Sequence, residues 1–259
     1  MNFGEKLKEW RARRRLSQLN LAFDAEISPK HLSFIETGRA KPSREMVLRL
    51  AEQLELPLRE RNVLLSSAGF APVFPEHSLD DEQLAAARRA IDIILKGHEP
   101  NPAIAIDRRW NLHSMNRAAE LLTAMVDPRL LEPPVNVLRF CLHPDGLARH
   151  IVNYFEWRHN LITHLERQVD LTGDQLLLAL VAELRDFPPP KGAIRPRNSE
   201  YLGFNIAVPL KLATPAGVLS FMSVTTVFGT PIEITLEELS IESFFPTDEI
   251  TTKFLATSA

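Results

Sequence analysis

The chain has 259 residues, of which 45% are hydrophobic and 24% charged, as in globular proteins with room for one large domain or two ordinary ones. The single cysteine, Cys141, excludes an intrachain disulfide framework and suits a reducing compartment. No apolar run approaches the ~20 residues that a membrane helix needs, and the charged N-terminal residues hold no apolar signal core. We therefore expect a cytoplasmic protein without membrane contact.

The net charge of −3 hides an uneven distribution along the chain. Residues 1–70 contain 13 Lys and Arg against 9 Asp and Glu, a net charge of +4, whereas the remainder has 17 against 24, a net charge of −7. Neutralisation of phosphates supplies much of the affinity for nucleic acid. A basic head on an acidic body therefore places a nucleic-acid surface in the head.

Residues 16–42 predict two short helices separated by a tight break. Ser17 is a favourable N-cap for the first helix, in which Leu19, Ala22 and Phe23 recur at a helical spacing that predicts an inward face. The pattern stops a few residues later, and a second start signal follows.

Ser28 is the cap of the second helix, and Pro29 occupies its first position, where a missing N–H costs nothing. Leu32 and Ile35 would face inward, and Gly38 is a typical residue just past a helix end. Two short helices joined by a tight turn, with polar residues early in the second, form the geometry that enters a DNA major groove.

Three further helices complete the predicted head. The first has an inward stripe of Phe3, Leu7 and Trp10, and the others cover residues 43–54 and 59–66. Four arginines follow the first stripe, at positions 11, 13, 14 and 15. Basic side chains at a helix C-terminus are favoured by the helix dipole, which is one interpretation of the cluster. The alternative is that one or two of these arginines contact the DNA phosphates.

The segments SQLNLA (17–22) and SPKHLSFIETGRAKPS (28–43) resemble the helix-turn-helix of XRE (Cro/C1, lambda-repressor-like) regulators, a similarity that covers about residues 3–66. The resemblance implies a double-stranded DNA operator as partner. It implies base-edge contacts from Ser28, Lys30, His31 and Phe34, and phosphate contacts from Gln18, Ser33, Arg39, Lys41 and Arg44. Phe34 departs from the Gln or Asn often found there, and is either a contact to a thymine methyl group or a core residue.

Prolines and a glycine without helical period mark residues 69–78 as a stiff linker. We thus expect a helix-turn-helix domain at 1–68 and a second domain at 79–259. A helix capped by Ser78, with Asp81 in a capping box, would open that domain, and its apolar face is either domain core or a dimer seam.

The second domain alternates between strand and helix patterns. Strands are predicted at 103–106, 110–115, 204–212, 218–227 and 232–245, with a helix from Asn116 and a long helical insert at 135–142, 145–169 and 173–184. Residues 187–197 are expected to form a loop, and a short closing helix follows Thr247 and Asp248. This order predicts an α+β, PAS-like domain in which an antiparallel sheet and helices enclose a small cavity.

Three segments of this region resemble one family: residues 105–122, 133–157 and 214–248, within a similarity that covers about residues 85–250. The family is the ligand-binding domain of MmyB-like transcription regulators. The resemblance implies a PAS-like pocket for a small, largely apolar effector, such as a fatty acid or a similar metabolite.

Eight residues are candidates to bind that molecule. The aromatic candidates either line the pocket or are core residues, and the asparagines either bind the ligand or brace the long helix. Arg139 and His143 lie one helical turn apart, and they would either face an acidic head group of the ligand or make structural pairs. The candidates are Trp110, Asn136, Arg139, His143, Asn153, Phe204, Phe221 and Phe228.

Catalytic and metal-binding patterns are not found in the sequence. Cys141 and His143 would lie on different faces of a helix, and no CxxC, HExxH, GxSxG or glycine-rich phosphate loop occurs. The predicted function is a dimeric DNA-binding transcription regulator modulated by a small apolar ligand. The alternative is a DNA-binding regulator whose C-terminal domain serves only dimerisation or a protein partner; an enzyme that regulates its own gene ranks far below both.

Overall fold

The computed structural model describes residues 2–194, 208–229 and 231–258, and the chain divides into two compact units. The first unit comprises the chain up to Ser78, Asp170–Thr172, and a segment that ends at Glu237; the second comprises the rest. The predicted linker, residues 69–78, holds neither helix nor strand.

Five helices form the body of the first unit. Side chains of Asn2, Ser17, Ser28 and Ser43 accept a hydrogen bond from the first turn of the helix that each precedes, so local capping fixes four of the five helix starts. The helices are α1 (Phe3–Arg13), α2 (Gln18–Asp24), α3 (Pro29–Glu36), α4 (Arg44–Gln53) and α5 (Leu58–Ser67).

The core of this unit confirms the predicted stripe of Phe3, Leu7 and Trp10 on α1, all of them buried. The predicted inward face of α2 was wrong. Leu19 and Phe23 are 64% and 82% exposed, and the buried residues of α2 are Leu21 and Ala22. A helix of only seven residues carries too few apolar positions for its period to fix which face is inward.

A second correction concerns the segment from Ile232, which was predicted to be part of the last strand. It contains the short helix α11 (Ile234–Glu237) in the first unit. The Glu233 carboxylate accepts the backbone N–H of Leu236 at 2.9 Å, as a helix-capping side chain does, and the strand begins only after this turn. The Ile234 N–H donates to the carbonyl of Pro75 at 2.9 Å, which ties α11 to the linker.

The second unit is built on one antiparallel sheet with the strand order β2-β1-β5-β4-β3. β5 is therefore the central strand, with β1 and β4 as its hydrogen-bonded neighbours. The strands are β1 (Ala103–Ile106), β2 (Leu112–Met115), β3 (Leu210–Thr214), β4 (Gly217–Val227) and β5 (Ser240–Pro246).

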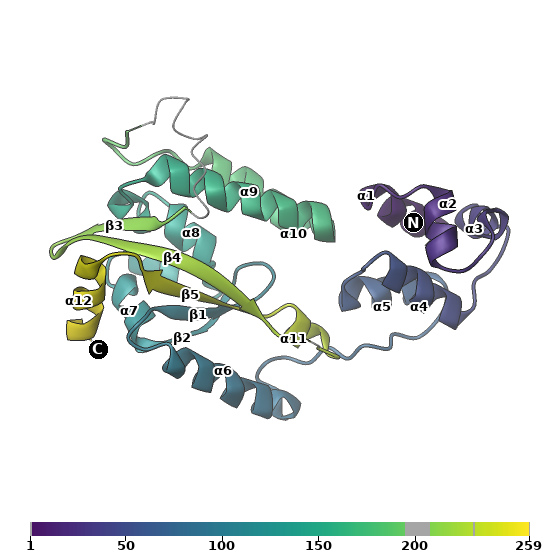
Figure 1. The fold of residues 1–259 in the computed structure, drawn as a ribbon, viewed down its shortest axis with the longest axis horizontal. Helices are drawn as coiled ribbons and strands as arrows, with labels where there is room; N and C mark the ends of the chain where they lie inside the picture. Colours follow the sequence, from purple (N-terminus) through teal and green to yellow (C-terminus); the bar gives the residue numbers. More distant parts are fainter. Residues whose placement is uncertain (1, 195–207, 230, 259) are drawn as a thin grey trace. The chain divides into compact units, whose positions relative to one another are not determined.

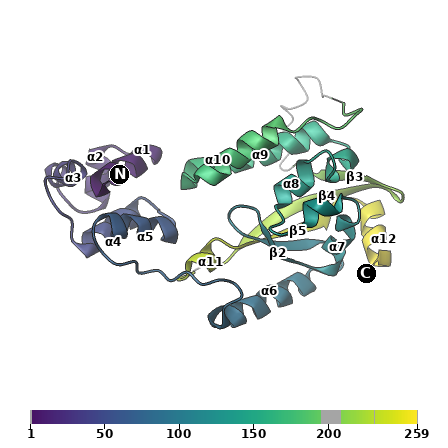
Figure 2. The same ribbon diagram turned by 180° about the vertical axis from the view of Figure 1, so that it is seen from behind.

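Helices cover both faces of this sheet, as the ribbon shows from two sides (Figures 1 and 2). On one face α6 packs through Ile91 and Leu95 against β1 and β5. The larger core lies on the opposite face, beneath α7 to α10. The helices are α6 (Ala85–Gly97), α7 (Arg117–Thr123), α8 (Val137–Leu142), α9 (Tyr154–Thr172), α10 (Gln175–Asp186) and α12 (Glu249–Ser258).

The boundaries of two predicted helices differ from the structure. α6 is preceded by a 3-10 turn capped by Asp81, whose carboxylate accepts the Gln83 N–H, so the predicted cap at Ser78 was wrong. The helix predicted at 145–169 is interrupted where Ile151 forms a β-bridge with Leu212, a long-range pairing that local periodicity does not report.

The predicted fold class is confirmed. A helical head precedes an α+β unit in which α6 is followed by two strands and a helix, then by a helical insert, and three further antiparallel strands close the sheet. None of the helices in the described ranges has both the length and the apolar character needed to cross a membrane.

Candidate functional site

The exposed face of α3 and the segment after it carry most of the residues predicted to contact DNA. Leu32 and Ile35 anchor the helix in the core, which turns the remaining side chains outward. Ser28, Lys30, Arg39, Lys41 and Arg44 are exposed, and His31, Ser33 and Phe34 are half-buried. The predicted contact residues of the helix thus lie along one exposed face, with three basic side chains following it.

Phe34 lies between two of these cations rather than in the core. The Lys30 ammonium is 5.7 Å and the Arg39 guanidinium carbon 6.0 Å from the centre of its ring. Such contacts are attractive because the ring face is electron-rich, and they hold both basic side chains beside the exposed part of the ring. Of the two sequence interpretations of Phe34, the structure supports the surface position.

A buried ion pair fixes α3 against α1. The Glu36 carboxylate receives Arg11 Nε at 2.6 Å and Nη2 at 3.0 Å, and Gln18 Nε2 donates to the same carboxylate at 2.6 Å. Because two side chains converge on Glu36, the pair sets the orientation of α3 relative to α1 and α2. Gln18, which was predicted to contact a phosphate, is half-buried, and its side chain is held by this hydrogen bond to Glu36.

The arginines after α1 have mainly structural partners. Arg13 pairs with Glu9 at 2.9 Å, and Arg14 donates to the carbonyls of Leu54 at 2.8 Å and Glu55 at 3.2 Å. Burial lowers the pKa of the Arg14 guanidinium despite the nearby Glu55. Arg11, Arg13 and Arg14 thus each have a partner within the helical head, and a phosphate contact of one or two of the arginines stays a prediction.

An apolar cavity of about 140 Å³ lies in the second unit, between the sheet and the helices that cover its larger core. Its walls come from all five strands of the sheet, from α7, α8 and α9, and from the loop before α8. Aromatic rings contribute on several sides, namely Trp110, Phe140, Trp157 and Phe244.

Glu242 is the carboxylate of the cavity wall. It occupies the middle of β5, opposite Ile104 on β1 and Thr225 on β4. Glu242 is only 5% exposed, and this burial raises the pKa of its carboxyl group. The hydrogen bond that Thr225 Oγ1 donates to the carboxylate lowers the pKa and offsets part of that rise. No Lys or Arg of the described ranges lines this cavity.

Burial also shifts the pKa values of two other titratable side chains of the wall. Burial raises the pKa of the Cys141 thiol to about 11, and its sulfur accepts the indole N–H of Trp157 at 3.3 Å. Burial, and to a lesser degree Arg167, lowers the pKa of His164. Cys141 is therefore an inert buried filler, as predicted from the sequence.

Two family models match this chain. The model of the MmyB-like transcription regulator ligand binding domain matches residues 87–257, which is well over half of the chain. This chain belongs to the MmyB-like transcription regulators. A helix-turn-helix domain model matches residues 2–64, the region of α1 to α5. Comparison with curated proteins gave no match.

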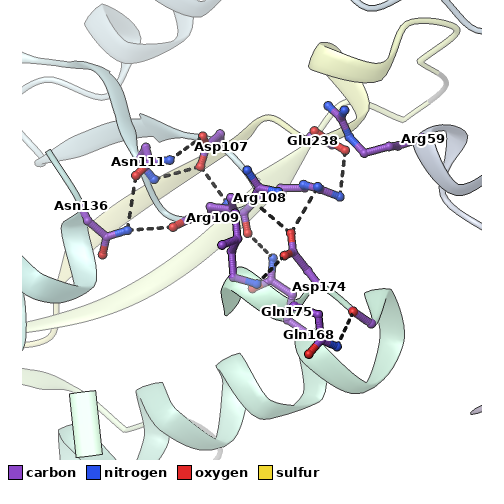
Figure 3. A network of polar contacts seen from close by, with 12 residues as sticks. Arg59, Asp107, Arg108, Arg109, Asn111, Asn136, Gln168, Asp174, Gln175 and Glu238 are labelled. Carbon is purple, nitrogen blue, oxygen red and sulfur yellow. Dashed lines mark hydrogen bonds and ion pairs between the residues drawn. The ribbon is translucent and has the colours of Figure 1, made fainter. Parts of the chain in front are cut away.

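In this MmyB-like regulator, one wall of the cavity is fixed by a polar network around the turn between β1 and β2 (Figure 3). Trp110 has a left-handed backbone with φ of 66°, which the turn stabilises: its N–H donates to the Asp107 carbonyl at 2.9 Å. The Asp107 carboxylate accepts the N–H groups of Arg109 at 2.7 Å and Asn111 at 2.9 Å. The indole of Trp110 is therefore held in place by its own turn.

The same network ties this turn to α9 and α10. Gln168 accepts the indole N–H of Trp110 at 3.0 Å and donates to the Arg108 carbonyl at 2.7 Å. Asp174, which caps α10, receives Arg108 at 3.2 Å and Arg109 at 3.1 Å (Figure 3). Burial raises the pKa of Asp174, but the Leu176 N–H and the two arginines outweigh it and leave the pKa below its usual value.

Of the seven ligand candidates that lie within the described residues, only Trp110 lines this cavity. Phe221 is buried in the core without reaching the cavity wall, and Phe228 packs on the opposite face of the sheet, near α6. Phe204 lies outside the described residues.

The four polar candidates have structural partners instead. Arg139 on α8 makes a two-pronged ion pair with Glu183 on α10, at 2.6 and 2.7 Å, and the His143 ring packs edge-on against Phe187. Asn136 caps α8 and donates to the Arg109 carbonyl at 2.8 Å. Asn153 donates to the Pro209 carbonyl at 2.8 Å. The polar groups thus brace the helical insert.

Glu242 was missed by the sequence interpretation. The signal was present in the segment SIESFFP, where Glu242 shares the alternation of Phe244 and therefore the inward face of a strand. A carboxylate at such a position is uncommon and marks a functional candidate. Among the described residues no cluster of three or more His, Cys, Asp or Glu is arranged to hold a metal ion.

Proposed function

We propose that this protein is a cytoplasmic, XRE-type transcription regulator that binds an operator sequence specifically and is modulated by a small, largely apolar molecule in the cavity. The observation that carries the proposal is the combination, in one chain, of an exposed basic face on α3 with an apolar cavity between an antiparallel sheet and its covering helices. A fatty acid or similar metabolite is the ligand class that the family resemblance implies.

On this proposal, α3 enters the major groove with its N-terminal residues toward base edges. Ser28, Lys30, His31 and Phe34 read the bases, while Arg39, Lys41 and Arg44 neutralise phosphates. The protein acts as a homodimer, so that two copies of α3 face successive major grooves ~34 Å apart.

The route by which a ligand modulates operator binding follows from the segment of the chain that connects the cavity to the helical head. Glu242 lies on β5, and β5 begins three residues after α11, which bonds to the linker through Pro75 and to the start of α5 through Leu58. A ligand that shifts β5 thereby acts on the spacing of the two heads. Coupling of this type commonly amounts to ~1–3 kcal/mol, which changes operator affinity several-fold.

A second candidate function is supported by the exposed apolar side chains of the sheet unit, which include Met222 and Val224 on β4. In that case the C-terminal unit only dimerises or binds a protein partner. A cavity that stays empty in the purified protein, with operator affinity independent of added ligands, would favour this alternative.

The test begins with native mass spectrometry of the purified protein, compared with the same sample after denaturing extraction. An additional mass released on unfolding, which then changes operator affinity when added back, supports modulation. Ala119→Leu narrows the cavity and should abolish the response, whereas Ala124→Leu places the same side chain on the surface and should not.

The DNA-binding part is tested separately with two variants. Lys30→Ala should lose sequence preference, whereas Arg39→Ala should weaken binding to all DNA about equally and lower its salt dependence. Unchanged operator affinity in both variants would refute the assignment of α3 as the recognition helix.

A further inference from the structure

The linker after α5 is hydrogen-bonded to the helical head rather than free. On one side it contacts α5: Asn62 Oδ1 accepts the N–H groups of Val73 at 2.9 Å and Phe74 at 3.1 Å, and Asn62 Nδ2 donates to the Phe74 carbonyl at 2.7 Å. The Arg61 guanidinium lies 5.9 Å from the centre of the Phe74 ring. This part of the linker is therefore held against α5.

On its other side the linker is bonded to α11 and to the residue before it, through contacts that we call the α11 clamp. Glu233 Oε1 accepts the His77 N–H at 2.7 Å, and Thr235 Oγ1 donates to the His77 carbonyl at 2.6 Å. The Ile234 N–H donates to the Pro75 carbonyl at 2.9 Å, and the Ile234 side chain is buried. Glu233 is only 5% exposed, and its second oxygen caps α11, so its loss would leave two N–H groups without their acceptor.

Two chain connections that leave the clamped segments have no spare length. Glu237 ends α11 in the helical head, and the next residue, Glu238, already forms an ion pair with Arg108 of the second unit at 3.2 Å. Leu239 follows in the core of that unit. The linker ends in the same way, since Leu79 packs against the same core. Neither connection therefore contains a free segment while the clamp is in place.

A linker without these bonds would give the helical head considerable reach. A flexible chain of nine residues, the length of residues 70–78, spans roughly 15–18 Å on average. Each base pair adds about 3.4 Å along the DNA axis, so such a tether would accommodate changes of about five base pairs in the separation of two half-sites. About five base pairs are half a helical turn, which moves a half-site to the opposite side of the duplex. A bonded linker lacks this tolerance.

We propose that the α11 clamp makes the regulator selective for the separation of its two operator half-sites, and that Glu233 and Thr235 are the positioning residues that impose this selectivity. Both act through the backbone of the linker, and neither belongs to the basic face of α3. The inference rests on the proposed function for the dimer and its operator. It deepens that function by adding half-site separation to base sequence as a determinant of operator choice.

The test needs no known operator. A pool of duplexes with a randomised segment of about 40 base pairs, which has room for half-sites up to about three turns apart, is selected on the full-length protein. The enriched duplexes are scored for the half-site sequence and for the distance between half-sites. The wild-type protein should enrich paired half-sites at one separation. Lengthening that separation by about five base pairs should weaken binding at least about tenfold.

The decisive variant combines Thr235→Val, which removes the hydroxyl that bonds to His77, with Glu233→Gln, which leaves one acceptor oxygen for two N–H groups. It should enrich the same half-site sequence at several separations and lose no more than about threefold on the lengthened duplex. Its affinity for a duplex with a single half-site should equal that of the wild-type protein. Thr252→Val, exposed on α12, is the matched control and should keep the single separation.

Asn62→Ala provides a second variant, because it frees the linker from α5 without changing α11. It should broaden the accepted separations in the same way. If circular dichroism shows that the double variant does not fold, Asn62→Ala decides in its place.

Three results would overturn the inference and leave the proposed function standing: several separations for the wild-type protein, an unchanged single separation in the folded double variant, or a loss of affinity for the single half-site without a change in separation. The last result would show that the clamp only stabilises the helical head. Enrichment of unpaired half-sites by the wild-type protein would refute the dimeric operator of the proposed function, and the inference with it.

Discussion

Gly4 on α1 lies directly against the backbone of Glu36 on α3: a Cβ atom at position 4 would be 2.4 Å from the Glu36 carbonyl oxygen. The contact is with main chain, which cannot rotate away as a side-chain tip would. The absence of a side chain at Gly4 is thus what allows α1 to pack on α3.

We expect Gly4→Ala to lower the free energy of unfolding of the helical head by about 1–3 kcal/mol, the usual effect of overpacking a tight contact. The change should also weaken operator binding, since α3 must move. Urea unfolding and operator titration measure the two effects. Gly97→Ala, at the end of α6, is the control because open space surrounds that position; equal effects of the two variants would contradict the packing argument.

Phe34 on α3 offers a direct test of the proposed DNA-contacting face. Since its ring lies beside Lys30 and Arg39 rather than in the core, Phe34→Ala should change the free energy of unfolding by less than about 1 kcal/mol. Operator preference should fall by about 1–3 kcal/mol at the base pair that the ring contacts. A stability loss of about 3–5 kcal/mol would instead identify a core residue.

The start of α5 depends on a side chain far away in the sequence. The N-cap position, Pro57, provides no side-chain hydrogen bond, and Glu237 accepts the Leu58 N–H at 2.7 Å. We expect Glu237→Ala to destabilise the helical head by about 0.5–2 kcal/mol, as the loss of an N-cap does. Amide exchange at the start of α5 should accelerate. Glu237→Gln keeps an acceptor oxygen and should retain most of the protection; loss of protection in both variants alike would point to the charge instead.

Asp174 predicts a pH-dependent stability. Its pKa is lowered in the folded protein, so its ion pairs contribute above the pKa of the unfolded chain, about 4, and are lost as the pH falls through the lower folded value. Asp174→Asn should cost about 1.5–3 kcal/mol at pH 7, because Arg108 and Arg109 lose their shared carboxylate while Asn can still cap α10.

The difference between Asp174→Asn and the wild-type protein should shrink as the pH falls below about 4, since protonation removes the same charge from the wild-type protein. Urea unfolding at a series of pH values measures it. Asp92→Asn, on the exposed surface of α6, is the control and should follow the wild-type curve. A cost for Asp174→Asn that does not change with pH would show that the ion pairs contribute little.

Local signals were sufficient to predict the helical head and most of the strands. Ser17, Ser28 and Ser43 are cap residues whose hydrogen bonds depend only on neighbouring residues, so the sequence reports them directly. The face of α2 was not predictable in this way: Leu19 and Leu21 are equally apolar, and only tertiary packing decides that Leu21 is the buried one.

The cavity wall could be predicted less well, because its residues meet through strand register and helix packing. Aromatic residues at strand positions were reasonable candidates, yet Phe228 lies on the other face of the sheet. Arg139 was a reasonable candidate to bind an acidic ligand, yet it forms an ion pair with Glu183, which is 44 residues away in the sequence. Such partners are set by tertiary structure, whereas the inward position of Glu242 follows from simple alternation within its strand.

The helical head is discontinuous in the sequence, because α11 belongs to it although more than 150 residues separate Ile234 from His77. A fragment that ends at the linker would lack the acceptor for Leu58 and the partner of Pro75. Chimeric regulators made by joining one head to another sensor at the linker would carry a mismatched α11. Recombination between members of this architecture should therefore succeed only when both segments are exchanged together.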